Sequence, residues 1–334
     1  HKKIYLSVIL GILFFVSCKD KKQYYEESGT VFHTLYTIKY EAPHILTDKI
    51  DAELQKFNLS LNPFNPNSII AKVNNNEAVE VDEWFTEVFN KSMEVSRNSD
   101  GVFDITCAPL VNLWGFGFNK KDSVTPAMID SLKTFVGYRK VHLEGKKVVK
   151  DDPRLLLNCS AIAKGYSCDV IARLLEKEGV ENYMILIGGE VVVKGVNQNG
   201  VCWRTGINLP EDDPDGIKNN YDEIVQLCKK GAIATSGNYR NFYIKDGKKY
   251  AHTIDPRTGY PAEQSVLSAT IVANDCMTAD AYATAFMAMG LEKARQMADS
   301  LPEIEYYVIY ADENGKHQIE YSKGMLQYLP KRKQ

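Results

Sequence analysis

The order of strand-like and helix-like segments constrains the fold of this 334-residue chain more than any other feature of its sequence. Strands are indicated where β-branched and aromatic residues alternate with polar ones, and helices where apolar residues recur with a helical period. Strands are expected at residues 31–40, 155–157, 183–187, 191–194, 232–235, 241–245, 266–273 and 306–310, with a hairpin at 141–150. Helices are expected at residues 46–57, 82–97, 126–135, 163–178, 276–289 and 291–300. Because these segments do not alternate as strand–helix–strand repeats, we expect an α+β fold and not a doubly wound parallel sheet.

The composition is that of a globular protein and excludes several classes of function. Hydrophobic residues make up 44% and charged residues 25% of the sequence, so a core can be buried and extensive disorder is excluded. The 40 basic and 43 acidic side chains give a net charge of −3. This balance provides no basic surface for nucleic acid, and we expect no nucleic-acid partner. The sequence also lacks a dinucleotide-binding glycine motif, a P-loop and a His-Glu-x-x-His zinc motif.

The N-terminal residues have the pattern of an export signal. Lys2 and Lys3 precede an uncharged apolar run at residues 4–16. This run is short for a membrane span and typical of the apolar region of a signal peptide. It ends at Ser17 and Cys18, after which the chain becomes strongly polar. A small residue directly before a cysteine at this point resembles the lipobox of bacterial lipoproteins.

We therefore expect a lipoprotein signal peptide at residues 1–17 and a lipid on Cys18. The polar residues 18–28 are interpreted as a tether, and residues 29–330 as the folded domain. This organisation predicts an exported protein that is held by its lipid at a membrane and faces the periplasm. An ordinary cleaved signal with an unrelated cysteine is one alternative, and a buried helix is another.

Seven cysteines are present, and lipidation of Cys18 would account for the odd number. The others are Cys107, Cys159, Cys168, Cys202, Cys228 and Cys276. None forms a Cys-x-x-Cys pair, which argues against zinc, and their spacing does not indicate a disulfide framework. We interpret Cys159, Cys168 and Cys276 as small buried thiols.

Two of the predicted helices carry candidate ligands. Asp280 and Thr284 lie one helical turn apart and therefore on one face, where a carboxylate and a hydroxyl could bind Mg²⁺. The alternative is an aspartate that interacts with the helix dipole amid alanines that only pack. Lys164 lies in the first turn of another helix, where a cation opposes the dipole unless it faces an anion such as phosphate. Its alternative is a solvated lysine.

Two further segments carry polar side chains beside turns. Asp104 lies among apolar residues of a predicted strand and needs a partner, such as a ring N–H. It could equally be a turn carboxylate. The segments 235–240 and 252–259 place polar residues around tight turns, as ligand-binding loops do. Within them His252 is a catalytic candidate, with a structural histidine as the alternative.

The order of these segments resembles the ApbE family of FAD:protein FMN transferases, many of which are exported lipoproteins. The resemblance covers about residues 28–312. The segments that carry it are Gly101-x-Phe103-Asp104-x-Thr106, Ala161-Ile162-Ala163-Lys164-Gly165-Tyr166-x-x-Asp169, Gly188-Gly189, Thr235-Ser236-Gly237-x-Tyr239, His252-x-Ile254-Asp255-Pro256-x-Thr258-Gly259 and Ala279-Asp280-Ala281-x-Ala283-Thr284.

The resemblance implies roles for individual residues. The ligands of Mg²⁺ would be the side chains of Asp280 and Thr284 and the backbone carbonyl of Ala161. The residues implied in FAD binding are Phe64, Val102, Phe103, Asp104, Lys164, Thr235, Ser236, Gly237, His252 and Ile254. Phe64 stands where many members have a stacking tyrosine, and His33 stands where glycine is common. A site that draws on residues from Phe64 to Thr284 implies one large domain with mixed or antiparallel sheets and packed helices.

The implied activity is the Mg²⁺-dependent transfer of the FMN moiety of FAD to a threonine hydroxyl of an acceptor flavoprotein, with release of AMP. His252 would serve as the base or orient the hydroxyl, and Asp255 is a competing candidate for the base. Two alternatives stay open. The protein could be an FAD pyrophosphatase that produces FMN and AMP, or a flavin-binding lipoprotein without catalytic activity.

Overall fold

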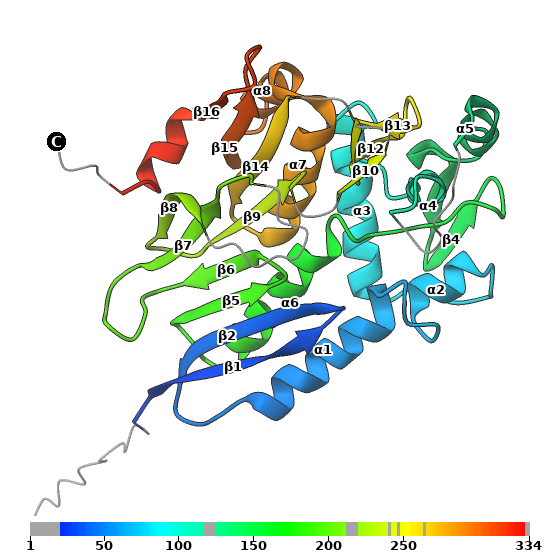
Figure 1. Cartoon of the computed structure of the whole chain (residues 1–334). Coiled ribbons are helices and arrows are strands. Elements are labelled where there is room, and N and C mark those ends of the chain that lie inside the picture. The colour runs from blue at the N-terminus through cyan, green and yellow to red at the C-terminus, as the bar shows by residue number, and fades with distance from the viewer. Residues whose placement is uncertain are drawn as a thin grey trace, which may run out of the picture.

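An eight-stranded sheet forms the centre of the computed structural model, which describes residues 21–116, 124–211, 220–239, 242–245, 248–262 and 265–330 (Figure 1). Its strands lie in the order β1 (Gln23–Val31), β2 (Thr34–Ala42), β5 (Tyr183–Ile187), β6 (Glu190–Lys194), β9 (Gly231–Gly237), β14 (Val266–Ala273), β15 (Ile304–Ala311) and β16 (His317–Tyr321). All neighbouring strands of this sheet pair antiparallel. The expected α+β class is therefore confirmed. The predicted signal peptide and Cys18 lie outside the described residues.

Helices and short hairpins complete the described fold. The helices are α1 (Thr47–Leu61), α2 (Ile69–Asn74), α3 (Glu83–Asn98), α4 (Ala108–Leu113), α5 (Pro126–Lys133), α6 (Ala163–Lys177), α7 (Cys276–Met289) and α8 (Leu291–Asp299), with 3₁₀ turns η1 (Tyr138–Lys140) and η2 (Lys323–Gln327). The hairpins are β3 (Val141–Glu144) with β4 (Lys147–Lys150), β7 (Trp203–Asn208) with β8 (Tyr221–Leu227), β10 (Phe242–Lys245) with β11 (Lys248–Ala251), and β12 (Ile254–Asp255) with β13 (Tyr260–Pro261).

Alternation along the central strands supplies two cores, one on each face of the sheet. In β14, Ile271 and Ala273 pack into a core that includes residues of α3 and α7. The residue between them, Val272, packs instead with Trp203 and Val225 of the β7–β8 hairpin. Successive strand residues point to opposite faces, so both faces of this sheet are covered.

The helix α7 is enclosed by the sheet and other helices (Figure 1). Every residue of α7 except Thr284 is buried. An apolar helix without a polar face requires such an enclosed position. The close approach of α6 depends on Gly165, because a Cβ atom there would lie 2.2 Å from the carbonyl oxygen of Cys276. The functional candidates on α6 and α7 are thus held together by close backbone packing.

Several local predictions were wrong. Residues 23–28 of the expected tether belong to β1, which pairs with β2 along its whole length. Residues 155–157 are not a strand, because the side-chain amide of Asn74 takes the place of a partner strand. It accepts a hydrogen bond from the Leu157 N–H at 2.7 Å and donates one to the Leu157 carbonyl at 2.9 Å. Residues 236–237 continue β9 and do not form a turn.

The cysteines follow the prediction only in part. Cys159, Cys168 and Cys276 are buried free thiols, as expected. Cys202 and Cys228, however, form a disulfide across a sequence separation of 26 residues. The antiparallel register of β7 and β8 explains this pair. Trp203 faces Leu227, and Cys202, which precedes Trp203, therefore lies opposite Cys228, which follows Leu227. The irregular spacing of the cysteines in the sequence therefore did not exclude a disulfide.

None of the helices in the described part of the chain is both long and apolar enough to cross a membrane.

Candidate active site

The start of α6 and the start of α7 are joined by two carboxylates, each of which accepts hydrogen bonds from the other helix. Asp280 of α7 accepts a hydrogen bond from the Gly165 N–H of α6 at 2.9 Å. Asp169 of α6 accepts hydrogen bonds from the N–H groups of Cys276 and Met277, both at 2.8 Å. Free N–H groups at helix starts favour anionic acceptors. This reciprocal capping fixes Asp280 relative to the first turn of α6.

Asp280 and Thr284 provide hard oxygen atoms that fit Mg²⁺. Asp280 is 3% exposed, and the Thr284 hydroxyl lies 3.3 Å from the Ser236 hydroxyl on β9. Ala161, whose carbonyl was the third implied ligand, lies half-buried in the turn before α6. Mg²⁺ is bound by few protein oxygens when phosphates and waters complete its shell, and this set is of that kind. The described residues contain no group of three or more His, Cys, Asp or Glu side chains that could hold a metal ion, here or elsewhere.

Lys164 forms an ion pair that the sequence did not reveal. Its ammonium donates a hydrogen bond to Glu190, whose side chain is 3% exposed at the start of β6. Burial lowers the pKa of Lys164, but the negative charges of Glu190 and Asp280 raise it by more, and the net shift is upward. Burial raises the pKa of Asp280, against the lowering effect of Lys164. A charged lysine thus lies between two buried carboxyl groups.

The tip of the β1–β2 hairpin lies at the same end of α6. A Cβ atom on Gly188 would lie 3.1 Å from the Thr34 side chain and 3.2 Å from the Lys164 side chain, so both side chains approach the backbone of Gly188 closely. The adjacent His33 has a left-handed φ of 59°, and its ring meets Phe64 edge-on at 5.6 Å. Phe64 is 51% exposed. An exposed ring at the same hairpin tip as a half-buried lysine is suited to a ligand that has an aromatic and an anionic part.

The segment 102–104 is an irregular bend and not the predicted strand. Val102 and Phe103 are buried in the core and leave little side-chain surface for a ligand. Asp104 accepts hydrogen bonds from the N–H groups of Thr106 at 2.7 Å and Tyr138 at 2.8 Å. Burial raises the pKa of Asp104, although these hydrogen bonds lower it. The turn-carboxylate alternative describes these contacts.

The two candidate bases lie on and before β12, which packs against α7. Both oxygens of Asp255 are occupied by Arg257, at 3.0 Å from Nε and 2.8 Å from Nη2. His252 is half-buried, with its ring 6.5 Å from that of Phe116. The neighbouring Ile254 is buried in an apolar cluster. Because Arg257 occupies both oxygens of Asp255, this geometry favours His252 as the base.

The β9 residues lie beside α7. The Thr235 hydroxyl is 2.8 Å from that of Thr270, and Ser236 faces Thr284 as described. At Gly237 a Cβ atom would lie 2.2 Å from the ring of Tyr239, so only glycine fits there without movement. The structure thus brings the β9 candidates, Asp280, Thr284 and Lys164 to one region. Glu190 is a member that sequence reasoning missed, and the sequence indicates Asp169 only as part of a motif, without a role.

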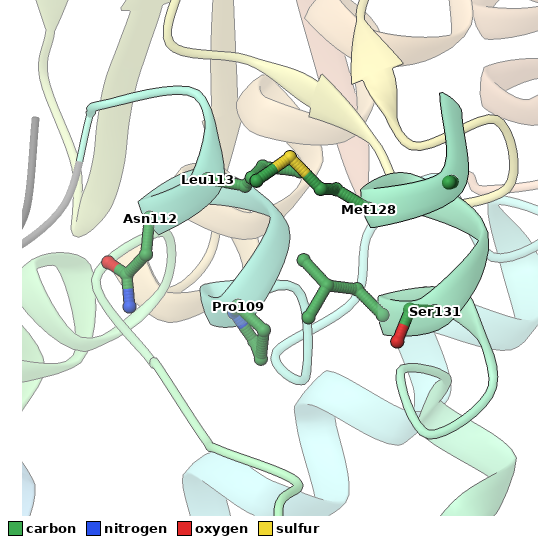
Figure 2. A pocket seen from close by; sticks show the side chains of 7 residues that line it. Pro109, Asn112, Leu113, Met128 and Ser131 are labelled. Carbon is green, nitrogen blue, oxygen red and sulfur yellow. The ribbon is translucent and has the colours of Figure 1, made fainter. Parts of the chain in front are cut away.

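A hollow of about 460 Å³ lies between α4 and α5 (Figure 2). The residues that line it are Pro109, Asn112, Leu113, Ala127, Met128, Ser131 and Leu132. None of these side chains is titratable, so the hollow has no group suited to acid–base chemistry or to neutralising a phosphate. The candidate chemistry lies instead at the α6–α7 junction.

Comparisons with known proteins identify the family. A protein of Vibrio cholerae named FAD:protein FMN transferase is 35% identical over 307 residues, which cover 89% of this chain and 90% of the relative. An Escherichia coli protein of the same name is 32% identical, covering 87% of this chain and 88% of the relative. A solved structure titled flavin transferase ApbE from Vibrio cholerae superposes with a TM-score of 0.83 at 34% identity, covering 92% of this chain and all of that one. The model of the ApbE family matches residues 32–308, and the chain belongs to that family.

Proposed function

We propose that this chain is an FAD:protein FMN transferase that requires Mg²⁺. It transfers the FMN moiety of FAD to a threonine hydroxyl of an acceptor flavoprotein and releases AMP. The names of the relatives support the reaction class. The observation that carries the proposal for this chain is the convergence of Asp280, Thr284 and Lys164 where α6 begins against α7.

Each candidate residue has its own role in the proposed reaction. Asp280, Thr284 and the carbonyl of Ala161 would hold Mg²⁺, which supplies positive charge opposite the pyrophosphate when it is bound. Lys164 binds a phosphate oxygen, and the exposed ring of Phe64 stacks on an aromatic ring of FAD. His252 accepts the proton of the threonine hydroxyl as its oxygen forms a bond to the FMN phosphorus. The bond between the two phosphates breaks, and AMP leaves.

The test combines the protein with FAD, Mg²⁺ and a candidate acceptor domain, followed by in-gel flavin fluorescence and measurement of AMP. A labelled acceptor with equimolar AMP is the expected result. Asp280→Ala should abolish labelling at limiting Mg²⁺, whereas Asp48→Ala, on the exposed first turn of α1, should leave it unchanged. AMP without label would mean an FAD pyrophosphatase, and neither product would mean a non-catalytic flavin-binding protein. Unchanged transfer by Asp280→Ala would contradict the metal role.

We also infer that the chain is exported and anchored by a lipid on Cys18, facing the periplasm. The Cys202–Cys228 disulfide supports export, because disulfides persist in oxidising compartments. Cys18→Ser should move the protein from the membrane fraction to the soluble periplasmic fraction, or leave it uncleaved. A cytoplasmic location of the unaltered chain would contradict this inference.

A further inference from the structure

A buried carboxylate that has no place in the reaction as described lies beside Lys164. The side chain of Glu190 is 3% exposed, and its Oε1 accepts the hydrogen bond from Lys164. Its Oε2 is buried without a hydrogen-bond partner among the described residues. A buried carboxylate with an unsatisfied oxygen destabilises a fold, so its presence here calls for an explanation other than stability.

The turn between β5 and β6 is shaped around this ion pair. Gly188 and Gly189 have φ angles of 65° and 104°, which disfavour residues with side chains. A Cβ atom on Gly188 would lie 3.2 Å from Glu190 Oε2 and 3.2 Å from Lys164 Cδ. The backbone therefore passes directly over both side chains and brings Glu190 under the lysine.

Lys164 needs an anionic partner in order to stay inside the site. It lies in the first turn of α6, where the partial positive charge of the helix start repels a cation. Its side chain is 35% exposed, so a path to solvent is open. Glu190 makes the direct contact, while Asp280 adds a second negative charge and is itself capped by Gly165. Without Glu190 the flexible stem of Lys164 is free to turn outward.

We propose that Glu190 is a positioning residue that keeps the Lys164 ammonium inside the site, where it binds a phosphate group of FAD. This inference rests on the proposed function, because it takes FAD as the anion that Lys164 contacts. Glu190 acts through Lys164 and does not touch the reacting atoms. Its effect on FAD binding should therefore depend on the presence of a cation at position 164.

A double-mutant cycle tests this dependence. The variants are Glu190→Gln, Lys164→Met and the double variant, and the readout is the Kd for FAD with Mg²⁺, measured by quenching of flavin fluorescence. Glu190→Gln should raise the Kd about tenfold in the Lys164 background, as expected when one partner of a buried charge pair is removed. In the Lys164→Met background the same change should alter the Kd by less than about twofold. Glu176→Gln changes a half-buried carboxylate that pairs with Lys230 near the other end of α6 and should leave the Kd unchanged.

The outcomes separate positioning from a general structural role. An equal rise of the Kd in both backgrounds, or no rise in the Lys164 background, would overturn the inference. The double variant removes both charges and should retain the fold. If Lys164→Met alone does not fold, Lys164→Arg provides a charged background in which Glu190→Gln must again raise the Kd.

The same samples separate this inference from the proposed function. Coupling in FAD binding without FMN transfer by the unaltered protein would sustain the role of Glu190 and contradict the transferase activity. If the unaltered protein transfers FMN but the effects of the two substitutions on the Kd are additive, the transferase activity is sustained and the role of Glu190 is contradicted.

Discussion

At the scale of single residues, Thr284 offers the most direct test of the proposed Mg²⁺ site. It is the one residue of α7 that is not buried, and its hydroxyl points toward Ser236. Thr284→Val removes this hydroxyl and keeps the shape of the side chain. We expect the Mg²⁺ concentration for half-maximal FMN transfer to rise about 10–100-fold, in the range seen when a metal site loses a supporting group. The thermal midpoint should stay nearly constant.

The matched control for Thr284→Val is Thr86→Val. The Thr86 hydroxyl donates to the carbonyl of Asp82 at the start of α3, in a different part of the fold. Its loss should leave the Mg²⁺ dependence of transfer unchanged. The same Mg²⁺ dependence in Thr284→Val and the unaltered protein would remove Thr284 from the proposed ligand set.

Sequence reasoning found residues whose partners are close in the chain, and missed those whose partners are distant. Asp280 and Thr284 could be placed on one face because helical spacing alone determines it. Glu190 meets Lys164 across 26 residues, and Asp169 meets Cys276 across 107. No local pattern encodes such contacts, since they depend on how α6, α7 and the β5–β6 turn pack.

At the scale of elements, the contact between α6 and α7 predicts a strong effect of one methyl group. In Gly165→Ala the new Cβ would lie 2.2 Å from the Cys276 carbonyl oxygen, so the two helices must separate. We expect a loss of about 2–4 kcal/mol in the free energy of unfolding, typical of severe overpacking. Urea denaturation measures it. Gly231→Ala, where a Cβ atom would meet only ordinary contacts at 3.6 Å or more, should change stability little. Equal stabilities of the two variants would contradict this account.

The reciprocal caps also predict a dependence of stability on pH. Burial raises the pKa of Asp169 to about 7, although the N–H groups of Cys276 and Met277 lower it. The folded state therefore binds more protons than the unfolded state between about pH 4 and pH 7, and this group makes stability fall as the pH rises through that window. In Asp169→Asn the decrease in the free energy of unfolding between pH 5 and pH 8 should be smaller by roughly 1–3 kcal/mol. Urea denaturation at both pH values measures this decrease.

Asp48→Asn serves as the control for this pH experiment, because Asp48 is exposed on α1. It should leave the difference between pH 5 and pH 8 as it is in the unaltered protein. An unchanged difference in Asp169→Asn would show that the Asp169 carboxyl does not take up a proton on folding.

Elements with a clear period and a clear stop were predictable. The helices at 82–97 and 276–289 match α3 and α7 within a residue, because Asp82 and Asp275 cap them and Ser99 and Gly290 follow their ends. The apolar run 155–157 was misjudged because burial alone does not supply a partner strand. The strands β7 and β8 and the short helix α4 carry too little periodicity to be recognised from the sequence.

At the scale of the whole molecule, the Cys202–Cys228 disulfide bears both on the fold and on the proposed export of the protein. It closes the hairpin β7–β8, which covers the face of the sheet opposite α6 and α7. The fold class could be predicted because the segment order excluded repeated strand–helix–strand units. The disulfide could not be predicted from the sequence, because it depends on the register of β7 and β8, which only the assembled hairpin defines.

The proposed export makes a measurable prediction about this disulfide. Protein isolated from the periplasm should expose only Cys107, Cys159, Cys168 and Cys276 to a thiol reagent after denaturation, and two more cysteines after reduction. Reduction should lower the free energy of unfolding by roughly 2–4 kcal/mol, because the unfolded chain regains the freedom that the cross-link removes. A double Cys202→Ser/Cys228→Ser variant should show the lower stability without reductant and no further loss with it. Free Cys202 and Cys228 in periplasmic protein would contradict the pairing, and a reductant effect in the double variant would mean that another pair is oxidised.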